Sequence, residues 1–234
     1  MTFAKKILDF NRSLEFKGRL PEGISVLNPF RENRDTMRLS EMFYNRFYND
    51  DKERIIILGI NPGRFGAGTT GLPFTDTIRL NEKCDIPFND FRTYEPSSVF
   101  IYEMLDAYGN YNDFFHKFYI SAVCPLGFTK TSVKGKELNY NYYDSRELTN
   151  AVSGFIVDTL HQQLDFGINR NVAFCLGTGK NDAFLRKLND RYAFFKNIRT
   201  LEHPRYIMQY KAKTKQHYIT KYLEAFQQAS LHFL

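Results

Sequence analysis

The sequence predicts an α/β fold in which helices cover both faces of a parallel sheet. Two observations lead to this prediction: short, continuous apolar runs of strand length recur along the chain, and amphipathic segments of helical length separate them. A strand that is buried on both faces is apolar at nearly every position, whereas a strand with one wet face alternates. Strands that alternate with helices along a chain are typical of parallel sheets.

The apolar runs give the strands. Residues 54–60 (RIIILGI) form the clearest one, residues 118–123 and 172–176 have the same character, and residues 198–201 form a weaker fourth. Helices are expected where apolar residues return every three or four positions. These segments are residues 3–14, 36–48, 97–108, 145–164, 179–192 and 214–228. Because no repeat or long linker divides them, we expect residues 1–234 to form a single domain.

Composition excludes several classes of protein. With 43% hydrophobic residues the chain can bury a core, and no stretch approaches the roughly 20 apolar residues of a membrane-spanning helix. Cys84, Cys124 and Cys175 are too few for an iron–sulfur cluster, and no zinc-ligand spacing is present. We therefore expect a monomer with no metal, no cofactor and no membrane partner. Reduced thiols suit the cytoplasm, with its nucleoid, of a bacterial source, or the nucleus of a eukaryotic one.

The charge is distributed unevenly. Residues 180–221 hold eleven Lys and Arg against three Asp and Glu, whereas the first 179 residues hold 21 basic and 22 acidic side chains. A basic segment is typical of a surface that binds a polyanion such as nucleic acid. A solvated helix surface gives the same count, so the charge alone leaves both interpretations open.

The most informative segment follows the first predicted strand. Residues 59–74 read GINPGRFGAGTTGLPF, and five glycines and two prolines indicate a shaped loop rather than a helix. Loops at the carboxyl ends of parallel strands carry functional residues. Asn61 precedes a proline, which disfavours the α region and holds Asn61 extended at the edge of the sheet. A tight turn capped by Asn61 is the alternative for this dipeptide alone.

Two glycine motifs raise the alternative of a nucleotide-binding oxidoreductase or kinase, but their context disfavours it. Residues 66–71 have the GxGxxG spacing, yet they neither follow the strand directly nor open a helix. Residues 177–180 (GTGK) lack the spacing of a phosphate-binding P-loop. Gly177, Gly179 and Lys180 would nevertheless place N–H groups and an ammonium at a helix start, as in an anion site. A simple strand-to-helix turn explains them equally well.

Taken together, these segments resemble the single-strand-selective monofunctional uracil-DNA glycosylase (SMUG) family, family 3 of the uracil-DNA glycosylase superfamily. That family has GMNPGPFGxxxTGVPFG in this loop, and residues 59–74 match it without a gap. The resemblance continues through CPL at residues 124–126 and GxG at residues 177–179. It ends at HPR, residues 203–205, where the family has HPSPR. The shortened last motif is similar to a bacterial SMUG-like branch.

The resemblance implies a fold, an activity and a partner. The fold is a three-layer α/β/α domain with a central four-stranded parallel sheet. The activity is hydrolysis of the N-glycosidic bond of uracil in base excision repair, which leaves an abasic site. The partner is DNA, single- or double-stranded. The main rival is a catalytically idle nucleic-acid-binding protein on the same fold, and the presence of both Asn61 and His203 argues against it, because binding needs neither.

The resemblance also assigns roles around the base. Asn61 would position the attacking water, and His203 would stabilise the charge that builds on the uracil oxygen at position 2. An asparagine cannot act as a strong base, so stabilisation of the leaving group must do most of the work. Phe74 would stack on the flipped base, and Gly63 takes the place of a tyrosine that shuts out 5-substituted bases in family 1. A lone histidine is often just a surface or core residue, which is the alternative for His203.

One family feature is missing, the asparagine before CPL that reads the base edge. The run here is YISAVC, residues 119–124. Ser121 can offer a hydroxyl in its place, or it is an ordinary buried strand serine. The backbone of Gly59 and Ile60 is the other candidate to contact the base. Because this asparagine and a side chain at Gly63 are both absent, we expect activity on at least one damaged base besides uracil.

The remaining candidates are predicted to bind DNA. Gly177, Gly179 and Lys180 would contact the backbone at a helix start. Arg205 and Tyr206 are the candidates to fill the gap that a flipped-out nucleotide leaves in the stack.

Overall fold

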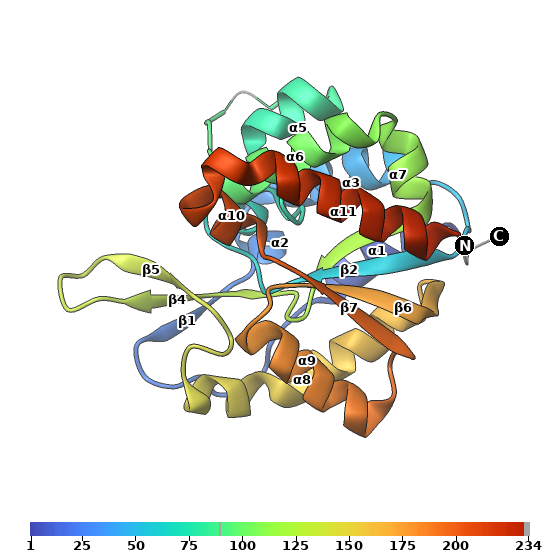
Figure 1. Cartoon of the computed structure of the whole chain (residues 1–234). Coiled ribbons are helices and arrows are strands. Elements are labelled where there is room, and N and C mark those ends of the chain that lie inside the picture. The colour runs from blue at the N-terminus through green and yellow to red at the C-terminus, as the bar shows by residue number, and fades with distance from the viewer. Residues whose placement is uncertain (89, 232–234) are drawn as a thin grey trace.

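The computed structural model describes residues 1–88 and 90–231, and a parallel sheet runs through its centre with helices above and below (Figure 1). The sheet has four strands in the order β3-β2-β6-β7. These are β2 (Arg54–Gly59), β3 (Phe118–Ala122), β6 (Ile168–Leu176) and β7 (Asn197–Leu201). The predicted α/β architecture with a four-stranded parallel sheet is therefore confirmed.

The four strands end at one edge of the sheet. Gly59 at the end of β2 pairs with Ala122 of β3, and Leu176 of β6 pairs with Leu201 of β7. Every residue of β2 is buried, as expected for a strand that is covered on both faces. Because parallel strands present their carboxyl ends at the same edge, the loops after β2, β3, β6 and β7 lie next to one another.

Helices form the two outer layers. On one face lie α8 (Arg146–Leu164) and α9 (Lys180–Tyr192), below the sheet in Figure 1. On the other lie α5 (Thr77–Cys84), α6 (Pro96–Tyr108), α7 (Tyr111–Lys117), α10 (Pro204–Tyr210) and α11 (Lys215–Ser230). The rest are α1 (Phe3–Ser13), α2 (Pro29–Glu32), α3 (Arg34–Phe47), α4 (Ala67–Thr70) and the 3-10 turn η1 (Ala212–Thr214). The predicted helix ends agree with the observed ones to within two residues.

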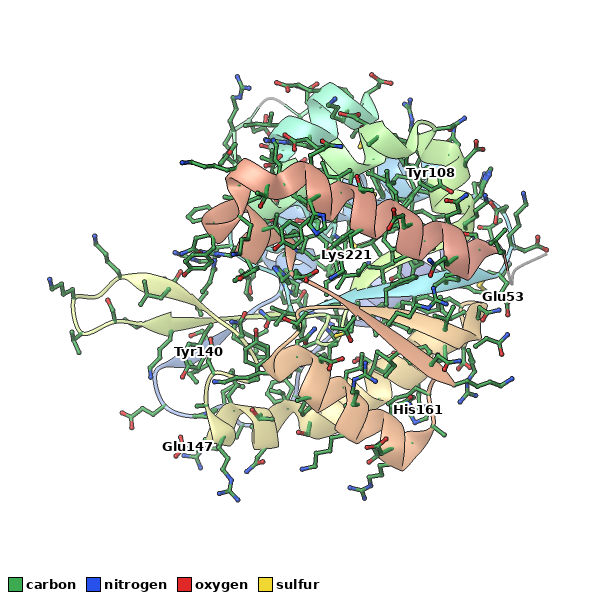
Figure 2. All side chains as sticks on the ribbon, viewed as in Figure 1. Glu53, Tyr108, Tyr140, Glu147, His161 and Lys221 are labelled. Atoms are coloured by element: carbon green, nitrogen blue, oxygen red, sulfur yellow. The ribbon has the colours of Figure 1, made fainter. Side chains whose placement is uncertain are left out.

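A second sheet was not predicted. It is antiparallel, has the order β1-β4-β5 and projects to the left of the body of the molecule in Figure 1. Its strands are β1 (Ile24–Leu27), β4 (Gly127–Thr131) and β5 (Glu137–Tyr140). Figure 2 labels Tyr140, at the end of this hairpin that is nearer the body. The segment that follows Tyr140 therefore lies at the edge where the parallel strands end.

The cysteines lie inside the core. Cys84, Cys124 and Cys175 are free thiols and are all buried. Burial raises the pKa of each thiol to about 12, so the thiols stay protonated at neutral pH. Within residues 1–88 and 90–231, no cluster of His, Cys, Asp and Glu side chains has a metal-binding arrangement. Across the same residues, no helix combines the length and apolar character that crossing a membrane requires.

Candidate active site

A cavity opens where the parallel strands end. The empty space in the cavity and its mouth, open solvent included, is about 400 Å³. Strand ends and loops that are far apart in the sequence form its wall. The predicted residues that line it are Gly59, Ile60, Asn61, Gly63, Phe74, Ser121 and His203. The structure thus brings together all the residues that were assigned to the base and to catalysis, and their individual roles stay predictions.

Phe74 forms one wall of the cavity in a strained backbone conformation. Its φ is 53°, in the left-handed region that residues other than glycine rarely adopt. A Cβ atom at Gly59 would lie 2.9 Å from Cζ of Phe74, so the ring occupies the space directly over the end of β2. Strain of this kind costs about 1–3 kcal/mol and is concentrated at functional sites. The ring is therefore held in place as a flat apolar surface.

His203 faces Phe74 from the start of α10. The two ring centroids are 5.6 Å apart. Nδ1 of His203 accepts a hydrogen bond from the backbone N–H of Arg205, at 3.1 Å. Burial, with a smaller contribution from the Arg205 guanidinium, lowers the pKa of His203 to about 4. The imidazole is therefore neutral at pH 7, and because Nδ1 accepts, the proton is on Nε2, which can donate to an oxygen in the cavity.

Three backbone groups fix the side chain of Asn61. Its Oδ1 accepts a hydrogen bond from the N–H of Tyr142 at 3.1 Å. Its Nδ2 donates to the carbonyl oxygens of Pro62 at 3.2 Å and Tyr140 at 3.4 Å. The amide orientation is thus determined by the chain that follows β5. One lone pair of Oδ1 is left to accept a hydrogen bond from a water molecule.

Two buried residues behind Asn61 were not predicted. Tyr142 is fully buried, and its hydroxyl donates to Oδ1 of Asn181 at 2.7 Å. Nδ2 of Asn181 donates to the carbonyl oxygens of Leu176 at 3.1 Å and Gly59 at 3.4 Å. Asn181 therefore ties the ends of β2 and β6 to the segment that orients Asn61. Apart from the neighbouring GTGK motif, nothing in the sequence distinguishes Asn181 from an ordinary residue in the first turn of a helix.

Loss of the Tyr142 hydroxyl is expected to destabilise the protein. Tyr142→Phe leaves the buried Oδ1 of Asn181 without its donor, which costs about 1–3 kcal/mol of unfolding free energy. Urea unfolding measures the change. The matched control is Tyr143→Phe, since no described residue accepts a hydrogen bond from the half-buried Tyr143 hydroxyl. Equal stabilities of the two variants would show that the Tyr142–Asn181 bond contributes nothing.

Ser121 lines the cavity, but its hydroxyl is directed elsewhere. It donates to Oε1 of Gln163, a fully buried residue of α8. The carbonyl oxygen of Ser121 lies 3.4 Å from a Cβ atom placed at Gly59, on the cavity side of the strand ends. Ser121 therefore offers a ligand its carbonyl oxygen and the acceptor lone pair of its hydroxyl. Among the described residues that line the cavity, Asn61 is the one with a side-chain amide.

An acidic residue in the cavity wall was also not predicted. Glu95 lies at the start of α6, and its side chain reaches both the cavity and the groove outside it. Burial, reinforced by Asp76 and opposed by Arg205, raises the pKa of Glu95 to about 7. In the sequence it is one of 26 acidic residues and belongs to none of the motifs. A carboxyl that titrates near neutral pH inside a cavity is a candidate for a functional role.

A broad groove leads from the cavity to the surface. The space in this groove, open solvent included, is about 1940 Å³, and Arg205 and Tyr206 line it. A branch of about 750 Å³ runs beside it, lined by Tyr206 together with Gly177, Gly179 and Lys180. Gly177 has a φ of 121°, which a residue with a side chain rarely adopts, and its N–H donates to Leu201 O. All five residues that were predicted to contact DNA therefore surround the entrance of the cavity.

Ion pairs reduce the free charge of the basic segment. Side-chain nitrogens of Arg186, Lys215 and Lys221 lie 2.9, 2.6 and 2.8 Å from carboxylate oxygens of Asp182, Glu103 and Glu202. Figure 2 labels Lys221 on α11. Each of these three basic side chains therefore has an acidic partner within the chain. Lys180 and Arg205, in contrast, line the groove and its branch.

Comparison with known proteins gives two matches that agree. The family described as Uracil DNA glycosylase superfamily matches residues 46–227, which include every residue of the cavity wall. Among solved structures, the crystal structure of wild-type SMUG2 from Pedobacter heparinus superimposes with a TM-score of 0.96. It is 54% identical in sequence, over 98% of this chain and 99% of that chain. Comparison with curated proteins found no match.

Proposed function

The chain belongs to the uracil DNA glycosylase superfamily, and we propose that the cavity beside Phe74 holds the base that is released from DNA. The protein is a SMUG-like, monofunctional uracil-DNA glycosylase that hydrolyses N-glycosidic bonds in base excision repair. One observation carries the proposal for the site: a single cavity gathers Asn61, Phe74 and a neutral His203.

The proposed mechanism uses His203 for the leaving group. The bond between C1′ of the sugar and N1 of uracil breaks first, which leaves positive charge on the sugar and negative charge on the base. The Nε2–H group of His203 donates to the uracil oxygen at position 2, where the negative charge builds. A donor that is preorganised in this way is worth about 2.7–4 kcal/mol in comparable sites. A neutral imidazole keeps its proton during this step and serves as a hydrogen-bond donor.

Asn61 completes the hydrolysis. A water molecule hydrogen-bonded to Oδ1 of Asn61 adds its oxygen to C1′, because the fixed amide holds it on the sugar side of the cavity. The proton that the water loses passes to solvent, and the uracil anion takes up a proton after it leaves. Asn61 itself gains no proton, since an amide is a very weak base.

DNA binding is expected to weaken with salt. We propose that Lys180, Arg205 and a few backbone groups contact phosphates, which gives a slope of log K against log salt of about −3, at roughly −0.9 per phosphate. Lys180→Ala should reduce the slope by about one unit. Lys187→Ala is the control, because this exposed lysine of α9 lies outside the groove. Fluorescence anisotropy over a range of salt concentrations measures the slopes, and equal slopes in both variants would exclude Lys180 from the interface.

The wild-type enzyme is expected to release more than one damaged base. Gly63 presents no side chain, and no amide reads the base edge, so 5-hydroxymethyluracil, hypoxanthine and xanthine are candidates beside uracil. Cytosine and adenine carry an amino group where these bases carry a carbonyl and should be rejected, because unpaired buried polar groups cost about 1–3 kcal/mol. Single-turnover rates on otherwise identical oligonucleotides measure the range. Release of uracil alone would show that another group closes the cavity.

Gly63→Ala provides a sharper form of this test. A Cβ atom at Gly63 would lie 3.5 Å from Nδ2 of Asn139, an ordinary contact, so the fold should tolerate it. The added methyl group would narrow the cavity next to Pro62 and Glu95. Because one carbon is worth about 1–3 kcal/mol in a shaped pocket, the single-turnover rate on 5-hydroxymethyluracil should fall roughly tenfold relative to the rate on uracil.

A further inference from the structure

The cavity holds a carboxyl group that the mechanism above does not use. The backbone N–H of Glu95 donates to Oδ2 of Asp76 at 2.8 Å, which anchors the start of α6. The side chain extends away from this anchor into the cavity and the groove. Among the described residues, no side chain or backbone group forms a hydrogen bond or ion pair with the carboxyl oxygens of Glu95. The group is therefore free to contact a ligand.

Two glycines make room for this carboxyl. A Cβ atom at Gly66 would lie only 1.8 Å from Oε2 of Glu95, and one at Gly63 would lie 3.9 Å from Oε1. A side chain at Gly66 would therefore displace the Glu95 carboxyl from its present position. The carboxyl lies against the loop that carries Asn61, on the side of the cavity where the wall has no side chain at Gly63.

The surroundings of Glu95 place the pKa of its carboxyl near neutral pH. The groups that surround it are Asp76, whose partner is Arg79 on α5 at 3.1 Å, Arg64 of the loop after β2, and His203 and Arg205 at the start of α10. Burial and the Asp76 carboxylate favour the protonated form, whereas Arg205 favours the ionised form, and the resulting pKa is about 7. His203 is neutral and adds no charge. Below pH 7 Glu95 is therefore mainly a carboxylic acid, and above pH 7 it is mainly a carboxylate.

A carboxylic acid in the cavity wall can assist the release of a deaminated purine more than the release of uracil. Uracil leaves as an anion that a hydrogen bond at its oxygen can stabilise. A deaminated purine has an additional imidazole ring, and its glycosidic bond breaks more readily when N7 of that ring receives a proton. A general acid whose pKa is near the working pH is effective in such a transfer. A purine is larger than uracil, and the cavity wall beside Glu95 has no side chain at Gly63.

We propose that Glu95 is the general acid for purine bases in this cavity. Its carboxylic acid gives a proton to N7 of flipped hypoxanthine or xanthine as the bond from C1′ to N9 breaks. The purine leaves as a neutral base that carries the transferred proton. The water held by Asn61 adds OH to C1′, and its second proton passes through solvent back to the Glu95 carboxylate. This assignment rests on the proposed function of the cavity and gives the purine substrates a catalytic residue of their own.

The test compares hypoxanthine with uracil in single-turnover assays from pH 5.5 to 8.5. In the wild type, the ratio of the two rates should be constant below about pH 6 and fall about tenfold per pH unit well above pH 7, because only the protonated acid acts. In Glu95→Gln, the ratio at pH 6 should be at least tenfold lower and should not change with pH. Glu147→Gln is the matched control, since Glu147 projects outward at the start of α8 (Figure 2).

Each possible result either supports or contradicts the role of Glu95 as a general acid. The Glu95→Asp variant keeps a carboxylic acid, so its ratio of the hypoxanthine rate to the uracil rate should still fall with pH. The pH profile of the wild type tests the inference without any variant. A Glu95→Gln enzyme with the wild-type ratio and the wild-type pH dependence would overturn the inference. So would a wild type that releases uracil but no purine at any pH, and the proposed function would then still stand. A wild type that releases no uracil would instead contradict the proposed function.

Discussion

Replacing His203 with alanine is expected to slow single-turnover release of uracil by about 10²–10³-fold while DNA binding changes little. The imidazole donates to an oxygen that is only weakly charged in bound DNA and strongly charged when the glycosidic bond breaks. Its loss therefore raises the barrier more than it weakens binding. Quenched-flow measurement of free uracil with enzyme in excess gives the rate, and anisotropy gives the affinity.

His203→Gln provides the matched comparison. Its side-chain amide keeps an N–H donor, so the rate should lie between those of the wild type and the alanine variant. The protonation state can be checked separately by NMR. The imidazole should stay neutral, with its proton on Nε2, from pH 8 to pH 5, because its pKa is about 4. An alanine variant that releases uracil at a near-normal rate would remove His203 from the mechanism.

Asn61→Ala should have the second large effect, a loss of about 10²-fold or more in single-turnover rate. The variant removes the oxygen that holds the water, and it also leaves the N–H of Tyr142 without its acceptor. A urea-unfolding curve must therefore accompany the rate, to show that the protein is folded under the assay conditions. Asn150→Ala, at an exposed position of α8, is the control for removal of an amide elsewhere.

Asn61→Asp separates the two parts of this effect. The carboxylate oxygen can still accept from Tyr142, but it cannot donate to Pro62 or Tyr140. If the role of Asn61 is to hold water, the aspartate variant should be clearly faster than the alanine variant. Rates near that of the wild type in Asn61→Ala would show that another group positions the water.

Much of the central layer could be predicted because burial constrains each residue there. Residues of β2 pack against helices on both faces, so every position is apolar or lies at a strand end. The loop after β2 could be predicted for a related reason: Pro62 and the glycines restrict the backbone to a few conformations. Asn61 and Phe74 belong to that loop, and its resemblance to the loop of the SMUG family assigned their roles.

The residues that the sequence did not indicate depend on contacts between distant segments. Tyr142 lies 81 positions after Asn61 and 39 before Asn181 in the chain, so no local pattern connects them. The second sheet was missed for a related reason. Three of the four residues of β5 are exposed, so this strand forms no apolar run in the sequence. Glu95 looks like any surface glutamate until the fold places it against Gly66.

The basic segment shows the limit of counting charges. Residues 180–221 carry a large excess of Lys and Arg, but Lys215 pairs with Glu103, which lies outside the segment and 112 positions away along the chain. A count of charges within the segment therefore misses a partner that only the fold supplies. Lys180 and Arg205, which were predicted from the sequence to bind DNA, line the groove and its branch.

A crystal structure of the slow Asn61→Ala variant with an oligonucleotide that contains uracil tests the central claim most directly. We expect the uracil to be flipped out of the DNA and stacked on Phe74, with its oxygen at position 2 about 2.7–3.1 Å from Nε2 of His203. A uracil that stays stacked in the DNA, or that binds with this oxygen turned away from His203, would contradict it.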